Sequence, residues 1–457
     1  MSHPTLIDLS RELAQGETTS RALVEESLAR IADPKGEGAR AFLSVYADRA
    51  LKEADAIDAA RAMGDVLPRF AGVPLSIKDL FDLEGEPTRA ASRALADAPA
   101  KAMDAEAVKR VRRAGFVIVG KTNMTEFAFS AFGENPHFGT PSSPWDRARG
   151  HIPGGSTSGG AVAVAEGMTP ATLGTDTGGS CRIPAAFCGI VGFRPSQGRV
   201  SRQGVFPLAP SLDSVGPLAM SVSSCASLDD ILSGGPGDDA PPAPLAGLAI
   251  GVIEGYVDER LDSSVAVAFA AALNRLGRAG AKLTPVRLPE LGELPNVERN
   301  GTLVVFEAFA VHRARLEMNA GLYDPWVRAR LESGSEKSAA DYIDLLSHRV
   351  RICEALEPKT RGFDALALPT VAIAPPAFDE LGEGEASRAL NSLILRNTAI
   401  ANFLDRPAIS IPCHPPDGAP VGFMLMGETG LDRRLLAVAR AAEQEVTGAP
   451  RVKTQSA

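Results

Sequence analysis

Three polar side chains stand in settings that suit acyl-transfer chemistry: Lys78, Ser156 and Ser180. Ser156 follows Gly-Gly and precedes Thr-Ser-Gly-Gly, and Ser180 ends a Gly-Thr-Asp-Thr-Gly-Gly-Ser run. Glycines just before a serine leave room for a substrate carbonyl and direct backbone amides at a developing oxyanion. The pattern favours a serine nucleophile, which would need a base. The alternative is that both stretches are tight turns whose serines cap the next segment.

Lys78 is the candidate base. It ends the apolar run Val73–Ile77 and precedes Asp79. A lysine at the end of a buried strand loses hydration, which lowers its pKa and lets the neutral amine accept a proton. The alternative is a structural lysine that reaches solvent or pairs with Asp79 or Asp82. Spacing alone leaves both interpretations open.

Two well-known functional motifs, the P-loop and the nucleophile elbow, are not supported by this sequence. Gly115–Thr122 matches the P-loop consensus, but its middle residues are Phe-Val-Ile-Val, which predict a strand and not a loop that curls around phosphate. Neither Ser156 nor Ser180 sits in the Gly-x-Ser-x-Gly pattern of a nucleophile elbow. His151 is the histidine nearest to these serines in sequence, and we interpret it as a turn residue before Pro153.

Metal and disulfide signals are weak. The five cysteines form no Cys-x-x-Cys pair and their number is odd, which is typical of reduced thiols in a cytoplasmic protein. No histidine has a partner at metal-ligand spacing. We therefore expect no metal and no cofactor.

The elements that must position these residues alternate along the chain. Short apolar runs flanked by Gly, Pro or Asp predict buried strands, and amphipathic stretches between several of them predict helices. This alternation favours an α/β fold around a mixed sheet. The predicted strands are 73–77, 116–119, 172–175, 248–253, 365–368, 408–411 and 421–426, and the predicted helices include 49–63, 104–114, 158–166, 264–279 and 431–445.

Composition narrows the class of protein. The net charge is -9 and no apolar run approaches the length of a membrane span, so the sequence predicts a protein that binds neither nucleic acid nor membrane. Glycine is concentrated: 14 of the 66 residues from Gly139 to Gly204 are glycine, against 44 of 457 in the whole chain. Such density indicates backbone that turns tightly or approaches a ligand.

Several motifs in order carry a family resemblance. The region from about residue 70 to 218 resembles the amidase signature family, and weaker similarity continues to the C-terminus. Ser156 and Ser180 lie 24 residues apart, as in that family. The matching stretches are Gly72–Asp79, Gly120–Ala128, Pro153–Gly160, Leu173–Ser180 and Arg182–Pro195.

The resemblance implies one compact amidase domain over residues 1–457. Its signature core would cover about 70–218, with N-terminal helices in 1–69 and a helical, specificity-determining region at about 255–360. It also implies an amidohydrolase with a Ser–Ser–Lys triad: Ser180 as nucleophile, Ser156 as bridging serine after a cis peptide bond, and Lys78 as base. An acyl-enzyme on Ser180 would then be hydrolysed by water.

The resemblance extends to residues around the triad. The backbone amides of Thr177, Gly178, Gly179 and Ser180 would form the oxyanion hole. Thr175, Asp176 and Arg182 would brace the turn, with contact between Arg182 and an acidic substrate as the alternative. Met124, Phe127, Phe129 and Phe132 would line the acyl pocket, with ordinary core packing as the alternative.

Two functions remain open for such a chain. The first is a cytoplasmic amidase for a small-molecule amide, in which a homodimer is one expectation because homodimers are frequent in the family. Aryl, short-chain acyl, indoleacetamide-like, carbamate and urea substrates all remain open. The second is the A subunit of the tRNA-dependent amidotransferase, which takes ammonia from glutamine within a complex.

Two departures weigh against the second function. The stretch Leu393–Thr398 lacks the carboxylate that would hold the glutamine amine, and Met424 stands where the amidotransferase chain usually has Gln.

Overall fold

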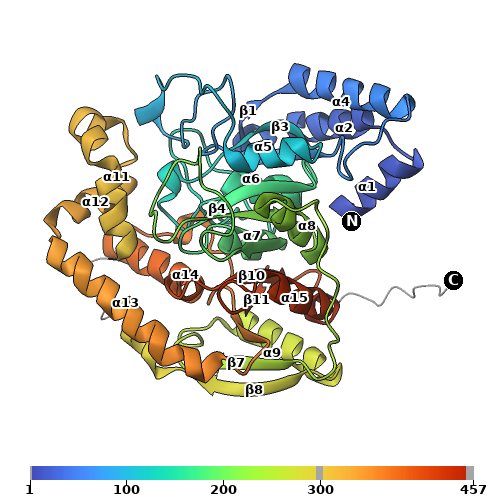
Figure 1. Ribbon diagram of the computed structural model, residues 1–457. Helices are drawn as coiled ribbons and strands as arrows, with labels where there is room; N and C mark the ends of the chain where they lie inside the picture. The colour runs from blue at the N-terminus through green and yellow to red at the C-terminus, as the bar shows by residue number, and fades with distance from the viewer. Residues whose placement is uncertain (1–2, 295–301, 449–457) are drawn as a thin grey trace.

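One mixed sheet of 11 strands runs through the computed structural model, which describes residues 3–294 and 302–448 (Figure 1). Helices flank the sheet, so the predicted α/β fold is confirmed. The strand order across the sheet is β1-β3-β2-β4-β6-β5-β10-β11-β9-β7-β8. In chain order the strands are β1 Phe42–Val45, β2 Pro74–Lys78, β3 Val117–Thr122, β4 Ala171–Asp176, β5 Val191–Arg194, β6 Ser214–Ala219, β7 Ala249–Glu254, β8 Lys282–Arg287, β9 Ala365–Pro369, β10 Ala408–Pro412 and β11 Gly422–Met426.

The strands β2, β3, β4, β7, β9, β10 and β11 confirm the seven predicted apolar runs to within a few residues. The sequence pattern does not predict the other four. β1 and β5 have only four residues each, and β6 is interrupted by Gly216 and Pro217. β8 contains Pro285 and is largely exposed, so its sequence lacks the apolar run of a buried strand.

Three neighbouring strands hold the polar residues of interest. β2 pairs in parallel with both β3 and β4, and every residue of the three is buried. Because Ser76 pairs with Thr172 and Ile77 with Leu173, Lys78 lies beside the C-terminal end of β4. β3 covers most of the P-loop look-alike, whose middle is therefore a strand as predicted.

The helices are α1 Leu6–Gln15, α2 Ser20–Ala32, α3 Gly38–Ala41, α4 Ala47–Ala62, α5 Glu106–Arg113, α6 Ser158–Ala165, α7 Arg182–Cys188, α8 Val222–Ser233, α9 Ser263–Arg278, α11 Leu303–Asn319, α12 Pro325–Glu332, α13 Ala339–Thr360, α14 Gly384–Phe403 and α15 Asp432–Thr447. The predicted helices correspond to α4, α5, α6, α9 and α15. Helices α11, α12 and α13 lie together on the left of Figure 1, and α14 runs from them toward the centre of the molecule.

Residues of the edge strand β8 oppose its pairing with a strand of another molecule. Lys282 and Arg287 are exposed at the two ends of β8, and Pro285 removes a backbone donor between them. Charged ends and a proline discourage pairing with a strand of another chain.

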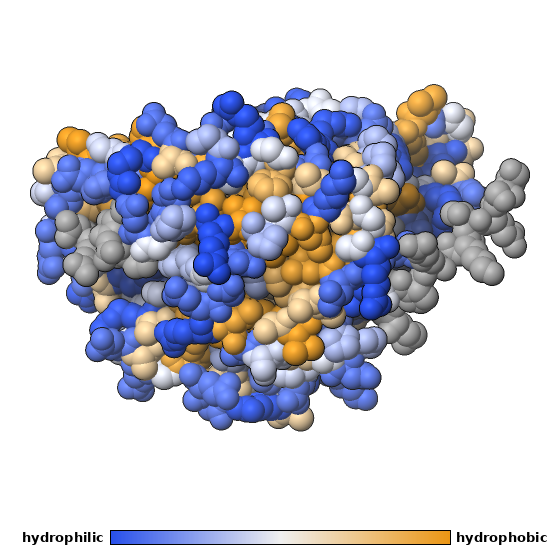
Figure 2. Space-filling model, turned by 90° about the horizontal axis from the view of Figure 1, so that it is seen from below, coloured by the Kyte–Doolittle hydropathy of each residue, from blue (hydrophilic) through white to orange (hydrophobic). Residues whose placement is uncertain are grey.

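Seen from below, hydrophilic side chains surround hydrophobic ones near the middle of the face (Figure 2). Among the described residues no helix is both long and apolar enough to cross a bilayer.

Candidate active site

Lys78 reaches two hydroxyls at the end of its strand. Its Nζ donates hydrogen bonds to Ser156 Oγ at 2.8 Å and to Thr175 Oγ1 at 3.0 Å. Thr175 comes from the neighbouring strand β4, and Ser156 lies in the turn before α6, after a cis Gly155–Ser156 peptide bond. The predicted contact between Lys78 and Ser156 is therefore present. Thr175 contacts the lysine itself and not only the turn that follows β4.

The surroundings of Lys78 favour a neutral amine. The side chain is fully buried, and burial lowers the pKa of Lys78 to about 8. Nearby Cys181, Asp176 and Asp213 oppose this effect but do not reverse it. In the part of the chain that the structure describes, no carboxylate lies within ion-pair distance of its Nζ. The alternative interpretation, in which Lys78 pairs with Asp79, is wrong: Asp79 lies 3.6 Å from Lys121 instead.

Ser180 lies in the loop that joins β4 to α7. It is 6% exposed, and its hydroxyl has no hydrogen-bond partner among residues 3–294 and 302–448. The backbone N–H of Thr157 donates to the Ser180 carbonyl at 3.3 Å, which places this loop against the turn that carries Ser156. The two predicted serines therefore come from adjacent segments.

The loop between β4 and α7 directs backbone N–H groups to one side. Thr398 Oγ1 donates to the Gly178 carbonyl at 2.7 Å, and Ile183 N donates to the Gly179 carbonyl at 2.7 Å. Because the C=O and N–H of a trans peptide point in opposite directions, the N–H groups of Gly179 and Ser180 point away from these donors. Within the described chain, the amides of Thr177, Gly178, Gly179 and Ser180 have no acceptor, as an oxyanion hole requires.

Gly179 is required by its backbone and its neighbours. Its φ is +138°, and a Cβ at this position would lie 2.2 Å from Thr398 Oγ1. A side chain here would therefore displace the threonine that holds the loop.

A buried ion pair braces the loop. Arg182 donates to both oxygens of Asp176, at 2.9 and 3.0 Å, and also to Asn402 Oδ1 at 2.7 Å. Asn402 returns a hydrogen bond to Asp176 Oδ1 at 2.9 Å. Burial alone would raise the pKa of Asp176, but the Arg182 guanidinium outweighs it and the pKa falls to about 2. Arg182 is fully buried, so these contacts favour bracing over substrate binding.

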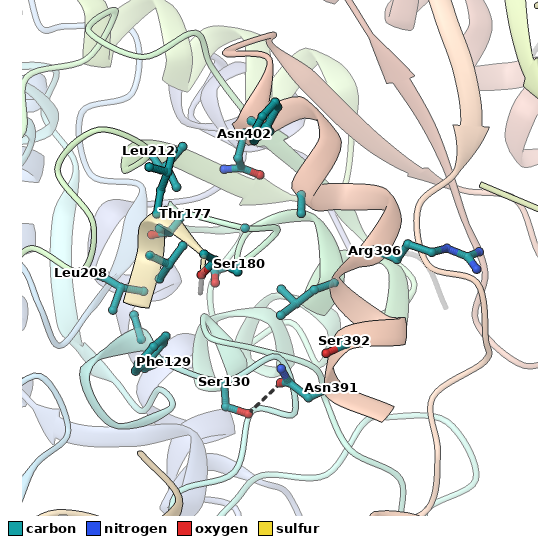
Figure 3. Close-up of a pocket in the computed structure, with 18 of the residues that line it drawn as sticks. Phe129, Ser130, Thr177, Ser180, Leu208, Leu212, Asn391, Ser392, Arg396 and Asn402 are labelled. Carbon is teal, nitrogen blue, oxygen red and sulfur yellow. Dashed lines mark hydrogen bonds between the residues drawn. The ribbon is translucent and has the colours of Figure 1, made fainter. Parts of the chain in front are cut away.

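A cavity of about 460 Å³ opens beside Ser180. Figure 3 shows Thr177 and Ser180 on one side of it and α14 on the other. Most of the wall is apolar. The lining residues are Ala128, Phe129, Ser130, Thr177, Gly178, Ser180, Leu208, Leu212, Tyr256, Leu294, Thr302, Leu303, Val304, Arg330, Leu345, Asn391, Ser392, Leu395, Arg396, Ala399, Asn402 and Phe403.

The cavity corrects the predicted acyl pocket. Of the four predicted residues, Phe129 lines it. Met124, Phe127 and Phe132 are not among its lining residues, and their buried side chains pack in hydrophobic clusters. Their alternative interpretation as core residues fits the structure.

Two arginines reach the cavity, and they differ in their partners. Arg396 donates to the carbonyls of Glu259 and Val257, and Figure 3 shows it pointing away from the cavity. Arg330 donates to the Phe129 carbonyl at 2.6 Å and lies over the Phe129 ring at 4.0 Å. Burial lowers the pKa of Arg330 to about 10, which still leaves it charged at neutral pH. Among the described residues, no carboxylate forms an ion pair with it.

Sequence reasoning missed the α14 wall of the cavity. Its lining residues Asn391, Leu395 and Asn402 all lie outside the predicted specificity region of about 255–360. Leu395 lies in the stretch Leu393–Thr398, which was considered only for its missing carboxylate, and a helical pattern through Gly384–Phe403 was the signal that could have found the element. The specificity region itself supplies other parts of the wall, including Tyr256, Arg330 and Leu345.

Comparison with known protein families identifies the family of this chain. A family model described as Amidase matches residues 22–436. The chain belongs to the amidase family. Its members are amidohydrolases that act on carbon–nitrogen bonds, and this chain is therefore an amidohydrolase. In the described residues, no group of three or more His, Cys, Asp or Glu is placed to hold a metal ion.

Relatives match over nearly the whole chain. This chain is 36% identical to the A subunit of glutamyl-tRNA(Gln) amidotransferase from Thioalkalivibrio sulfidiphilus, over 96% of both chains. It is 37% identical to the same subunit from Anaeromyxobacter dehalogenans, over 94% of both chains. A crystal structure of an amidase has a TM-score of 0.88 at 35% identity, covering 97% of this chain and all of that one. The crystal structure of the A subunit of glutamyl-tRNA(Gln) amidotransferase from Thermotoga maritima has a TM-score of 0.77 at 30% identity. The match covers 96% of this chain and 94% of that one.

Proposed function

We propose that the chain hydrolyses amides through Lys78, Ser156 and Ser180. The 2.8 Å contact between Lys78 and Ser156, in a fully buried setting, is the observation that supports this most directly. Neutral Lys78 takes the proton of Ser156, and Ser156 takes that of Ser180 as its Oγ attacks the carbonyl carbon. The four loop amides stabilise the oxyanion.

The second half of the reaction releases the products. The proton held on Lys78 returns through Ser156 to the nitrogen of the substrate, and the C–N bond breaks. The amine leaves, and the acyl group stays on Ser180 as an ester. Water then attacks the ester with the same base and oxyanion hole, and the carboxylic acid leaves.

The substrate that the cavity favours bears a carboxylate. Arg330 brings a positive charge to a mostly apolar wall, and no described carboxylate compensates it. A substrate carboxylate would form a charge-assisted hydrogen bond with the guanidinium in a site of low dielectric. We therefore propose an amidase for small amides whose acyl part carries an acidic group.

The second candidate is the glutaminase component of an amidotransferase complex. It is favoured by the names of the curated relatives, each of which is the A subunit of glutamyl-tRNA(Gln) amidotransferase. Glutamine also carries a carboxylate, so Arg330 suits both candidates. A free amino acid carries an ammonium as well, and the described lining offers no carboxylate for it. Leu395 lies within the stretch where the amidotransferase chain would place that acid, which favours the stand-alone amidase.

One panel of substrates separates the candidates. The purified chain is assayed for ammonia release from monoamides of dicarboxylic acids, from neutral amides of equal length and from glutamine, with Ser180→Ala as the blank. Preference for the acidic amides by the lone chain supports the first candidate. Glutamine turnover that requires added partner proteins supports the second.

The same panel tests Arg330. Arg330→Met should lower kcat/KM for the acidic amides by about 100-fold, since a charge-assisted hydrogen bond is lost. Arg388→Met, at an exposed arginine of α14, is the matched control. Equal loss on acidic and neutral amides would contradict a role in charge recognition.

A further inference from the structure

Asn391 presents an unused amide group to the cavity. It lies on α14, and the residue is 3% exposed. Its Oδ1 accepts a hydrogen bond from the backbone N–H of Ala131 at 3.0 Å and lies 3.4 Å from Ser130 Oγ. These two contacts fix the orientation of the carboxamide.

Once Oδ1 is fixed, the position of Nδ2 follows. Figure 3 shows the nitrogen of Asn391 turned away from Ser130 and toward the cavity. Neither of its two hydrogens has an acceptor in the part of the chain that the structure describes. An amide nitrogen that faces the cavity and has no protein acceptor is available to donate to a substrate oxygen.

Asn391 and Arg330 are anchored on the same short segment. Arg330 donates to the carbonyl of Phe129, and Asn391 accepts from the amide of Ala131, two residues further on. The two side chains come from different helices, α12 and α14. The segment 129–131 therefore brings a guanidinium and a carboxamide to one part of the cavity wall.

We propose that Asn391 is a specificity-determining residue, whose Nδ2 donates to an oxygen of the carboxylate that Arg330 attracts. This proposal rests on the proposed function and deepens it. A carboxylate has two oxygens and can accept from both side chains at once. The class of substrate would be a dicarboxylic acid with one carboxyl group as the amide.

The rival explanation is that Asn391 only holds the turn at Ser130 and Ala131. Asn391→Asp separates the two roles, because a carboxylate keeps an acceptor for the Ala131 amide. The variant replaces the two hydrogens of Nδ2 with a negative oxygen facing the cavity. Ser387→Asp, one turn earlier on α14 and outside the cavity, adds the same charge to the same helix as the matched control.

The experiment measures kcat and KM for the best dicarboxylic monoamide and for the neutral amide of equal length. For Asn391→Asp we expect KM for the acidic amide to rise by about tenfold or more, because like charges repel in the cavity. The neutral amide should change by less than about threefold. Asn391→Ala should lower the acidic preference less, and Ser387→Asp should match the wild type.

Several results would overturn the proposal. Equal losses on both amides would assign Asn391 to the turn alone, and no loss on either would remove it from the site. The proposed function fails differently: wild-type enzyme without acidic preference, unchanged by Arg330→Met, would overturn both substrate proposals. An acidic preference that Arg330→Met removes and Asn391→Asp leaves intact would overturn only the role of Asn391.

Discussion

Lys78 Nζ lies 2.8 Å from Ser156 Oγ in a fully buried site, and no described carboxylate forms an ion pair with it. The neighbouring Thr175 hydroxyl, at 3.0 Å, accepts a second hydrogen bond from the same nitrogen. A lysine held in this way is oriented by hydroxyls and not by an ion pair. Its proton is therefore removed more easily than that of a surface lysine.

The first prediction concerns pH. Because the pKa of Lys78 is lowered to about 8 and the neutral amine is the active base, kcat/KM should rise with pH through about 8 and then level off. Lys78→Ala should lower kcat by at least about 1000-fold. A pH–rate profile from pH 5 to 10 checks this. A flat profile, with an active Lys78→Ala variant, would contradict Lys78 as the base.

The second prediction concerns the loop that carries Ser180. Thr398→Val keeps the shape of the side chain but removes the hydroxyl that donates to the Gly178 carbonyl. We expect kcat to fall by about tenfold or more with KM within about threefold, because the misplaced amides stabilise mainly the transition state. Steady-state kinetics of the wild type and the variant with one amide substrate measure both kcat and KM. A change confined to KM would place Thr398 in substrate binding instead.

The third prediction concerns the buried pair of Asp176 and Arg182. Asp176→Asn leaves the guanidinium without its counter-charge and should lower the free energy of unfolding by about 3–5 kcal/mol. Urea denaturation at pH 7 measures the loss. Asp379→Asn, at an exposed carboxylate, serves as the control. A difference below about 1 kcal/mol would show that Asn402 and solvent satisfy Arg182.

The same pair predicts a direction for acid stability. The folded pKa of Asp176 is lowered to about 2, below the unfolded value of about 3.9. Its contribution to stability is therefore present above pH 4 and is lost as pH falls from about 4 through 2. The wild type should lose stability more steeply than Asp176→Asn across this range. Parallel curves from denaturation at several pH values would contradict the assignment.

The fourth prediction concerns Glu126, a buried carboxylate that holds α12. Its side chain accepts hydrogen bonds from Ser92 Oγ at 2.7 Å and from Asp324 N at 2.7 Å, at the start of the helix that carries Arg330. Burial raises the pKa of Glu126 to about 7. A carboxyl group with a raised folded pKa favours the fold when protonated, so its contribution falls as pH rises from about 4 to 7.

Glu126→Gln should remove that pH dependence, about 1–3 kcal/mol in size. The variant should also raise KM for acidic amides by a few-fold, because Asp324 and the start of α12 lose a charged acceptor. Thermal unfolding at pH 5 and pH 8, together with kinetics, checks both effects. An unchanged pH dependence of stability would show that Glu126 is not the titrating group.

Glycine-rich turns and a strand-end lysine singled out Lys78, Ser156 and Ser180, but local chemistry left a structural role open for each of them. The resemblance to the amidase signature family assigned the triad. The contact between Lys78 and Thr175 required the parallel pairing of β2 and β4, which no local pattern specifies. Asn391 and Arg330 carry no motif, since a polar residue on a helix is ordinarily a solvent-facing one.

The phenylalanines at 127 and 129 show what the sequence could not predict about the cavity wall. Phe127 and Phe129 are two positions apart, chemically identical and both buried in the same core cluster, yet only Phe129 lines the cavity. Phe127 and Ala128 have positive φ values of 51° and 63°, which turn the chain between them. A sequence of apolar letters does not reveal such a turn at non-glycine residues.

The residues of helix α14 before and after Thr398 differ in their tolerance to change. Asn391 and Leu395, before it, contribute to the cavity wall, whereas Thr398 and Asn402 hold the loop of the nucleophile. Engineering of a new substrate range should therefore vary the residues before Thr398 and leave Thr398 and Asn402 untouched. In a directed-evolution library across this helix, beneficial substitutions would cluster before Thr398.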